Sequence, residues 1–186
     1  MNAAQWMDEA LTLAGEAAAE GEIPVGAVVV DREGRVIGRG RNRRESGDPL
    51  GHAELIAIAE AARAIGDWRL EGTTMVVTLE PCAMCAGALV NARVETLIFG
   101  ASDPKAGFCG SLGNLVQDSR LNHRLEVVSG FEEDRARALL QRFFQQLRKG
   151  SIGTSFITKA SPMRCGKMSV VRPSRTFLSL LICASS

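Results

Sequence analysis

Hydrophobic and polar positions follow two different periods along this chain, and each period predicts a different kind of element. Apolar residues recur at helical spacing between residues 3 and 20, where Trp6, Leu13 and Ala17 share one face and Gly21 follows as a stop. The same reasoning predicts helices at residues 52–66, 82–93 and 132–150, and a short one within 102–115. Short β-branched runs predict strands at residues 24–30, 35–41, 73–80, 94–101 and 124–130.

The order of these predicted elements narrows the fold class. Strands alternate with helices along most of the chain, and the turn DREG joins the first two strands as a hairpin. Such alternation is typical of an α/β fold in which helices cover both faces of one sheet. We therefore expect a mixed sheet of about five strands. A length of 186 residues suits one ordinary domain.

Charge divides the chain into two unequal parts, although the formal net charge of +1 favours no class of partner. All 21 acidic residues lie within residues 1–150, whereas residues 151–186 hold only basic charges and eight serines. We therefore expect a domain at 1–150 and a basic, serine-rich tail at 151–186 that is disordered or loosely packed. A short docked helix at residues 176–183 is the alternative for the tail.

The cysteines and the apolar runs bear on the compartment. Five cysteines at irregular spacing do not form the even set of a disulfide framework. The first residues lack a basic segment followed by an apolar run, so we expect no secretory signal. The longest apolar stretch, TFLSLLICA, is too short to span a membrane. We expect a cytoplasmic protein, in which a Cys-x-x-Cys pair is more often metal-binding or catalytic than a disulfide.

Two short motifs, HAE and PCAMC, combine into a candidate metal centre, and each opens a predicted helix. His52, Cys82 and Cys85 offer one imidazole and two thiolates, which Zn²⁺ binds tetrahedrally while a catalytic site leaves the fourth position to water. Two cysteines three positions apart lie on one face of a helix, and the positive end of the helix dipole favours their thiolates. Glu54 stands beside this group as a base and acid for the bound water.

Each part of this constellation has a simpler explanation when it is taken alone. A Cys-x-x-Cys pair also serves thioredoxin-like redox chemistry, which needs no metal partner. A histidine such as His52 at a helix start is often structural, and Glu54 suits the dipole of its helix. A closed structural zinc site would need a fourth protein ligand, for which Cys109 and His123 are the candidates. The two motifs together favour a zinc enzyme.

A longer set of segments resembles one enzyme family. The combination of HAE and PCAMC is similar to the signature of the zinc-dependent cytidine and adenosine deaminases. The segments FGASDPKAG, GSLGNLVQ, LNHRLEV and ALLQRFFQQLR resemble the bacterial tRNA-specific adenosine deaminases rather than free-nucleoside deaminases. The resemblance runs over about residues 5–149. It implies the cytidine deaminase-like fold, a three-layer α/β/α sandwich.

The resemblance also implies a reaction, which is hydrolytic deamination of adenosine to inosine at the wobble position of a tRNA anticodon. One Zn²⁺ per subunit would be held by His52, Cys82 and Cys85. Glu54 would deprotonate the water on the metal, pass the proton to the purine ring and help ammonia leave. The target base would be flipped out to reach the pocket, and this costs less in an RNA loop than in a duplex.

Five further residues match family positions that contact the substrate. Asn42 matches an asparagine that lies against the purine, although a loop residue that accepts a positive φ is the simpler explanation. Asp103 and Lys105 match a substrate-facing loop. Phe144 and Arg148 match RNA-contacting positions on the last helix, where one member of an aromatic pair is usually buried.

Several features leave alternatives open. A basic run beside the site, formed by Arg39, Arg41, Arg43 and Arg44, suits phosphate contact or a solvated hairpin edge equally well. The family works as a homodimer, and the apolar segment CAGALV is either an interface or buried within the monomer. Two rival functions are a deaminase of a free base or nucleotide, such as guanine or cytosine, and a non-catalytic zinc-binding RNA module.

Overall fold

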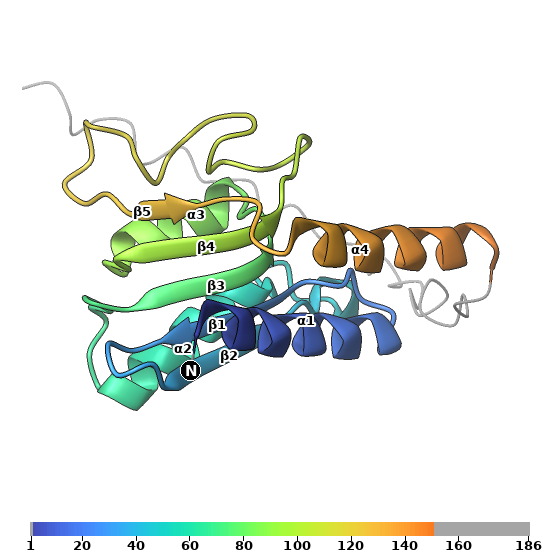
Figure 1. Ribbon diagram of the computed structural model, residues 1–186, viewed down its shortest axis with the longest axis horizontal. Coiled ribbons are helices and arrows are strands. Elements are labelled where there is room, and N and C mark those ends of the chain that lie inside the picture. The colour runs from blue at the N-terminus through green and yellow to red at the C-terminus, as the bar shows by residue number, and fades with distance from the viewer. Residues whose placement is uncertain (1, 151–186) are drawn as a thin grey trace, which may run out of the picture. The chain divides into compact units, whose positions relative to one another are not determined.

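The computed structural model describes residues 2–150, in which helices lie on both faces of a five-stranded sheet (Figure 1). The expectations for residues 151–186 lie outside the described residues. The elements, in chain order, are α1 (Ala3–Ala19), β1 (Gly26–Val30), β2 (Val36–Arg41), the short 3₁₀ helix η1 (Arg44–Ser46), α2 (Ala53–Ile65), β3 (Thr74–Leu79), α3 (Ala83–Asn91), β4 (Thr96–Ala101), β5 (Glu126–Val128) and α4 (Glu133–Arg148).

The strand order β2-β1-β3-β4-β5 decides which chain ends meet. β1 runs antiparallel to both β2 and β3, whereas β3, β4 and β5 are parallel to one another. The ends of β3 and β4 therefore lie at the same end of the sheet as the end of β2 and the start of β1. We call this the site end of the sheet. The expected mixed α/β sheet is confirmed.

Alternation of side chains along the central strands builds a core on each face. Ala27 and Val29 of β1 pack with α2 and α3, whereas Val28 and Val30 pack with Met7 of α1. β1 is thus buried on both faces, as its unbroken apolar sequence requires. The two cores fix α2 and α3 on one face and α1 on the other, where α4 packs against β4.

Two glycines of β2 let α2 lie unusually close to the sheet. A Cβ atom at Gly40 would stand 1.9 Å from the carbonyl oxygen of Ala53, and one at Gly38 would stand 2.2 Å from that of Ala57. The helix contributes only small side chains here, since Ala53, Ala57 and Ala61 are fully buried at four-residue spacing. This contact fixes the start of α2, where the HAE motif lies.

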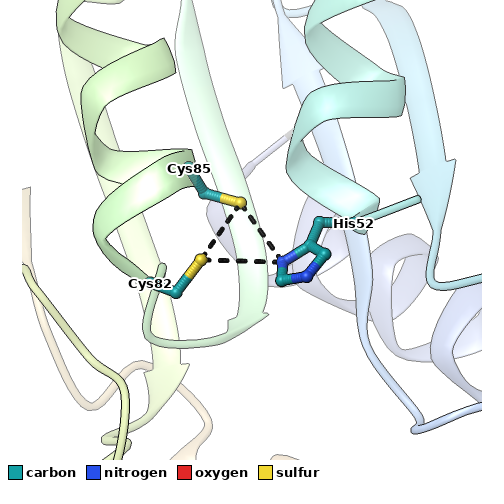
Figure 2. A group of neighbouring side chains, drawn as sticks. All are labelled: His52, Cys82 and Cys85. Carbon is teal, nitrogen blue, oxygen red and sulfur yellow. Dashed lines mark hydrogen bonds between the residues drawn. The ribbon is translucent and has the colours of Figure 1, made fainter. Parts of the chain in front are cut away.

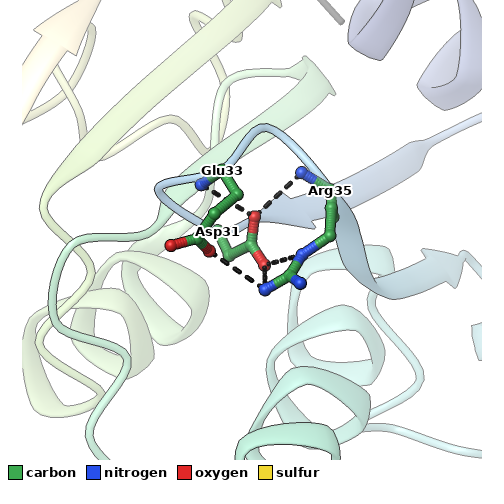
Figure 3. A network of polar contacts seen from close by, with 3 residues as sticks. All are labelled: Asp31, Glu33 and Arg35. Atoms are coloured by element: carbon green, nitrogen blue, oxygen red, sulfur yellow. Dashed lines mark hydrogen bonds and ion pairs between the residues drawn. The ribbon is translucent and has the colours of Figure 1, made fainter.

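The hairpin between β1 and β2 is closed by Asp31 (Figure 3). Its Oδ1 accepts hydrogen bonds from the backbone N–H groups of Glu33 and Arg35, and its Oδ2 lies 2.6 Å from the Arg35 guanidinium. Burial opposes ionisation of Asp31, but the bonds from Arg35 outweigh it and hold its pKa below the usual value. The turn lies at the end of the sheet opposite the site end.

The short helix expected within residues 102–115 is wrong, because the chain there forms turns and isolated bridges. Gly110 has a φ of 151°, which breaks helical geometry. The backbone N–H groups of Cys109 and Ser111 point to the carboxylate of Glu80 instead of along a helix. Within the described residues, no helix combines the length and apolar character needed to cross a membrane.

Candidate active site

Three side chains from the starts of two helices meet at the site end of the sheet (Figure 2). His52 is the N-cap of α2, Cys82 is the N-cap of α3, and Cys85 follows in the first turn. His52 Nδ1 lies 3.6 Å from Cys82 Sγ and 3.5 Å from Cys85 Sγ, and the two sulfurs are 3.7 Å apart. The three residues expected as metal ligands are therefore brought together.

These separations fit a zinc ion. Zn–S and Zn–N bonds of about 2.3 and 2.0 Å at tetrahedral angles put two sulfurs about 3.8 Å apart and a sulfur and a nitrogen about 3.5 Å apart. The measured triangle matches both values. Among residues 2–150, His52, Cys82 and Cys85 are the one group of three or more such side chains close enough to share an ion.

The two candidates for a fourth protein ligand have other partners. Cys109 is buried with its sulfur 3.8 Å from the carbonyl oxygen of Pro81. His123 Nε2 lies 2.7 Å from the carbonyl oxygen of Val94. Within the described part of the chain, the group thus offers three ligands and an open fourth position, which is the arrangement of a catalytic zinc.

The thiols of Cys82 and Cys85 are prepared for a cation. The Cys82 and Cys85 sulfurs share a hydrogen bond of 3.7 Å, and this bond lowers the pKa of Cys82 to about 5. The same bond, together with burial, raises the pKa of Cys85. The pair therefore favours a thiolate at Cys82, and a bound metal would deprotonate the second thiol.

Glu54 lies in the first turn of α2 and is only 4% exposed. Burial raises the pKa of its carboxyl group. A carboxyl group with a raised pKa can hold a proton at a pH where an exposed glutamate would release it, so it can act as base and then as acid. Its place two residues after His52 puts this chemistry beside the candidate metal group.

A cavity of about 130 Å³ opens at this point. It is lined by Ile23, Val25, Asn42, Arg44, His52, Glu54, Leu79, Glu80, Cys82, Asp103 and Ala106. These residues come from the chain ends that the strand order brings to the site end of the sheet. Asn42 is 6% exposed, and its amide donates to Glu22 at 3.4 Å. The cavity therefore collects Asn42 and Asp103 beside His52, Glu54 and Cys82.

Three of the predicted substrate contacts do not line this cavity. Lys105 lies on the same loop as Asp103, but its side chain is outside the lining. Phe144 and Arg148 belong to α4, which contributes nothing to the cavity. Of the aromatic pair, Phe143 is buried at 3% exposure and Phe144 is exposed at 42%.

The basic run beside the site is already paired with acidic side chains. Each arginine has its own carboxylate partner, and the pairs are Arg39–Glu9, Arg41–Glu20, Arg43–Asp48 and Arg44–Glu45. These pairs are partly exposed, so each contributes little to stability. The segment CAGALV is mostly interior, since Ala86, Leu89 and Val90 are buried in the core of the monomer.

Two buried glutamates near the cavity were not predicted from the sequence. The Glu80 carboxylate accepts hydrogen bonds from Asp103, Cys109 and Ser111. Burial opposes its ionisation, but these bonds, with that of the Ser111 hydroxyl the strongest, hold the pKa of Glu80 below its usual value.

Glu22 plays the matching part on the other side of the cavity. Its carboxylate accepts from the backbone N–H groups of Glu45 and Ser46, each at 2.9 Å, and from the amide of Asn42. It thereby anchors the 42–51 loop, which joins β2 to α2. The partners of Glu22 and Glu80 are mostly backbone amides of distant loops, so residue type and spacing give no signal for either role.

Comparison with known proteins agrees with this geometry. Residues 1–148 match the family model described as MafB19-like deaminase. Over 145 residues the chain is 51% identical to the tRNA-specific adenosine deaminase of Bacillus subtilis (strain 168), an alignment that covers 77% of this chain and 89% of that protein.

Solved structures give a similar result. A structure from a study of A-to-I editing by tRNA:A34 deaminases at the wobble position of transfer RNA has a TM-score of 0.70 and 41% identity, and the match covers 74% of this chain and 99% of that one. A guanine deaminase from Nitrosomonas europaea has a TM-score of 0.65 and 26% identity, with 74% and 82% covered. The solved structures that resemble this chain in fold are therefore deaminases.

Proposed function

This chain belongs to the MafB19-like deaminase family and is 51% identical to a tRNA-specific adenosine deaminase, so we propose that it converts adenosine to inosine at the wobble position of tRNA anticodons. The reaction is hydrolytic: the oxygen of water replaces the amino group at C6 of the adenine, and ammonia leaves. The observation that carries this function is a three-ligand group beside a buried glutamate, at a cavity lined by His52, Cys82 and Glu54.

His52, Cys82 and Cys85 hold one Zn²⁺ per chain in this proposal. The ion, when bound, makes water acidic enough to act as a nucleophile at neutral pH. The two helix starts orient the ligands before the metal arrives, because the backbone at each N-cap is fixed by the first turn of its helix. The donor set and its spacing support this assignment.

Glu54 moves the protons of the reaction. It takes a proton from the attacking water, gives it to the purine ring nitrogen beside C6, and then assists the departure of ammonia. Its burial supports this role, because the raised pKa allows the carboxyl group to hold the proton between these steps.

The remaining contacts position the nucleotide. Asn42 and Asp103 line the cavity and would bind the flipped-out nucleotide, while Lys105 lies on the same loop as Asp103 and would meet the RNA outside the cavity. Phe144 and Arg148 would contact the anticodon stem-loop from α4, and the exposure of Phe144 supports this. A base can stack on such an exposed aromatic side chain.

The proposal extends to the organisation of the protein. Residues 1–150 form the deaminase domain, which works as a homodimer on cytoplasmic tRNA. The relatives named as tRNA-specific adenosine deaminases support the tRNA partner.

The test is to replace Glu54 in the purified full-length chain and to measure inosine in an anticodon stem-loop with adenosine at the wobble position. Glu54→Gln keeps the shape of the side chain but removes the proton carrier. We expect a loss of about 10³-fold in kcat with zinc content unchanged. Glu60→Gln, on the exposed side of the same helix, is the matched control and should keep wild-type activity.

Other outcomes would decide between the rivals. Turnover of free guanine or cytidine by the wild type, without reaction of the stem-loop, would favour a free-base or nucleotide deaminase. Zinc and RNA binding without any inosine would favour a non-catalytic module. Full activity of the Glu54→Gln variant would remove this residue from the mechanism.

A further inference from the structure

Glu80 is a buried carboxylate that the proposed mechanism does not use. It lies directly after β3, is 3% exposed and lines the same cavity as Glu54. It is neither one of the three metal ligands nor the proposed proton carrier. A buried carboxylate is strongly unfavourable unless its oxygens are hydrogen-bonded, so its partners show what it does.

The two oxygens of Glu80 have different partners. Oε1 accepts from the backbone N–H groups of Cys109 and Ser111, each at 3.0 Å. Oε2 accepts from the backbone N–H of Asp103 at 3.0 Å and from the hydroxyl group of Ser111. One carboxylate thus ties both ends of the 103–111 loop to the strand that leads to Cys82.

The start of this loop is a turn closed by its own hydrogen bonds. Asp103 Oδ1 accepts from the N–H groups of Lys105 and Ala106 at 2.9 and 3.3 Å, and the Asp103 carbonyl accepts from Gly107 at 2.9 Å. All three bonds lie within the turn and therefore fix its shape but not its place. The position of its first residue depends on the bond from the Asp103 N–H to Glu80, while Gly107 at its other end bridges to Cys82.

Gly107 shows how closely the loop is built onto Glu80. A Cβ atom at this position would stand 2.3 Å from the carboxyl carbon of Glu80, so no other residue fits without displacement. Gly107 also forms an isolated antiparallel bridge with Cys82, and the Phe108 N–H donates to the Pro81 carbonyl at 2.9 Å. The loop is therefore held against the segment that carries a metal ligand.

We propose that Glu80 is a positioning residue for the substrate nucleotide, because its bond to the Asp103 N–H sets the place of the cavity wall formed by Asp103 and Ala106. This inference rests on the proposed function, in which the 103–111 loop faces the RNA. Glu80 itself does not touch the reacting atoms. Its effect is on substrate binding, which is the same before and during the chemical step, so its loss raises KM rather than lowering kcat.

The variant Glu80→Gln isolates this one bond. The side-chain carbonyl of glutamine can still accept from Cys109 and Ser111, and the Ser111 hydroxyl can turn to accept from the new NH₂ group. Only the Asp103 N–H is left facing a donor. We expect KM for the anticodon stem-loop to rise about tenfold, which is the usual size of effect for one buried bond of this kind, with kcat within about twofold of wild type.

Ser111→Ala is the matched control. It removes the hydroxyl bond to the same carboxylate and leaves all three backbone N–H bonds in place. It should lower the melting temperature as Glu80→Gln does, but it should leave KM near the wild-type value. Zinc content should stay at one per chain in both variants. An equal rise of KM in both variants would show that general loop stability is what matters, and it would overturn the proposal.

Amide hydrogen exchange separates this proposal from the proposed function. We expect Glu80→Gln to accelerate exchange at Asp103 while Cys109 stays protected, and Ser111→Ala to change neither. If the wild type forms no inosine, the proposed function fails, but the exchange rate at Asp103 still tests whether Glu80 holds the turn in position. Unchanged exchange at Asp103 in Glu80→Gln, or loss of zinc with a fall in kcat, would contradict the proposal.

Discussion

At the scale of single residues, the three positions from Glu80 to Cys82 hold two groups with opposite tasks. The thiol of Cys82 faces the candidate metal, while the carboxylate of Glu80 faces the loop that covers the cavity. Pro81 stands between them and accepts a bond from that loop through its carbonyl oxygen. The candidate metal group and the residue that holds the cavity wall are therefore only two positions apart in the chain.

Asp31 gives a prediction about pH that concerns stability and not catalysis. Its pKa in the folded chain is lower than the ordinary value of 3.8, so the bonds of Asp31 contribute stability above about pH 4, and this contribution is lost as pH falls through the folded pKa. Asp31→Asn keeps an acceptor for the two backbone N–H groups but loses the ion pair with Arg35.

We therefore expect Asp31→Asn to melt slightly below the wild type at pH 7, and the two melting temperatures to converge as the pH falls below about 4. Thermal unfolding followed by circular dichroism at several pH values checks this. A difference that stays constant across the range would mean that the charge of Asp31 contributes nothing to the turn.

Sequence spacing predicted that His52, Cys82 and Cys85 come together, but it did not predict the carboxylates that hold the neighbouring loops. The side chains of His52, Cys82 and Cys85 share the capacity to bind zinc, so their spacing in the sequence predicts a candidate site. Glu22 and Glu80 are carboxylates bonded to backbone amides, and any residue can supply such an amide. Only the folded chain shows which amides reach them.

At the scale of elements, the contact between β2 and α2 controls the start of the helix that carries the HAE motif. Gly40→Ala would place a methyl group 1.9 Å from the Ala53 carbonyl oxygen, so the helix must move. We expect a loss of about 3 kcal/mol in the free energy of unfolding and a lower zinc content, because His52 moves with the helix.

Gly15→Ala in α1 is the control for this substitution. A Cβ atom at Gly15 meets nothing within 4 Å, and alanine suits a helix interior better than glycine. We expect a gain of roughly 0.5–1 kcal/mol, with zinc content unchanged. Urea unfolding and metal analysis of both variants test the pair. Equal stabilities for the two variants would show that β2 and α2 can separate without cost.

The elements themselves were largely predictable, because each has a clear period and a clear stop. Gly66 ends α2 at a φ of 77°, as a glycine after a periodic stretch suggests. The segment 102–115 is the exception, because the short helix expected there does not form. Its glycines and its bonds to Glu80 decide against a helix.

At the scale of the whole molecule, the metal would join two halves of the domain that are distant in sequence. His52 comes from α2 and the cysteines from α3, so binding links these helices. Removing the metal with a chelator should lower the melting temperature by about 5–10 °C, as expected for an ion present at about a hundred times its dissociation constant.

Cysteine variants give this experiment its controls. Cys82→Ala should have a lower melting temperature than the wild type, and the chelator should not change it further, because this variant lacks one metal ligand. Cys109→Ala should respond to the chelator as the wild type does, since Cys109 bonds to Pro81 and lies outside the metal group. If the chelator left the melting temperature of Cys109→Ala unchanged, Cys109 would be a metal ligand, which would contradict the three-ligand site.

The class of the fold was predictable at this scale, but the strand order was not. Alternating strands and helices imply one sheet covered on both faces, and the family resemblance implies the α/β/α sandwich. Nothing in local pattern states that β1 lies between β2 and β3. That order brings Asn42 and Asp103 into the same cavity.

The direction of the strands also places the loops of the molecule at two opposite ends of the sheet, where changes in sequence have different consequences. The turn closed by Asp31 stands at one end of the sheet, and the 42–51 and 103–111 loops stand at the other. We expect insertions, tags or a fused domain at the Asp31 turn to lower the stability of the fold without changing the cavity. Changes of length in the other two loops would reshape the cavity, so we expect them to alter which substrates the protein accepts.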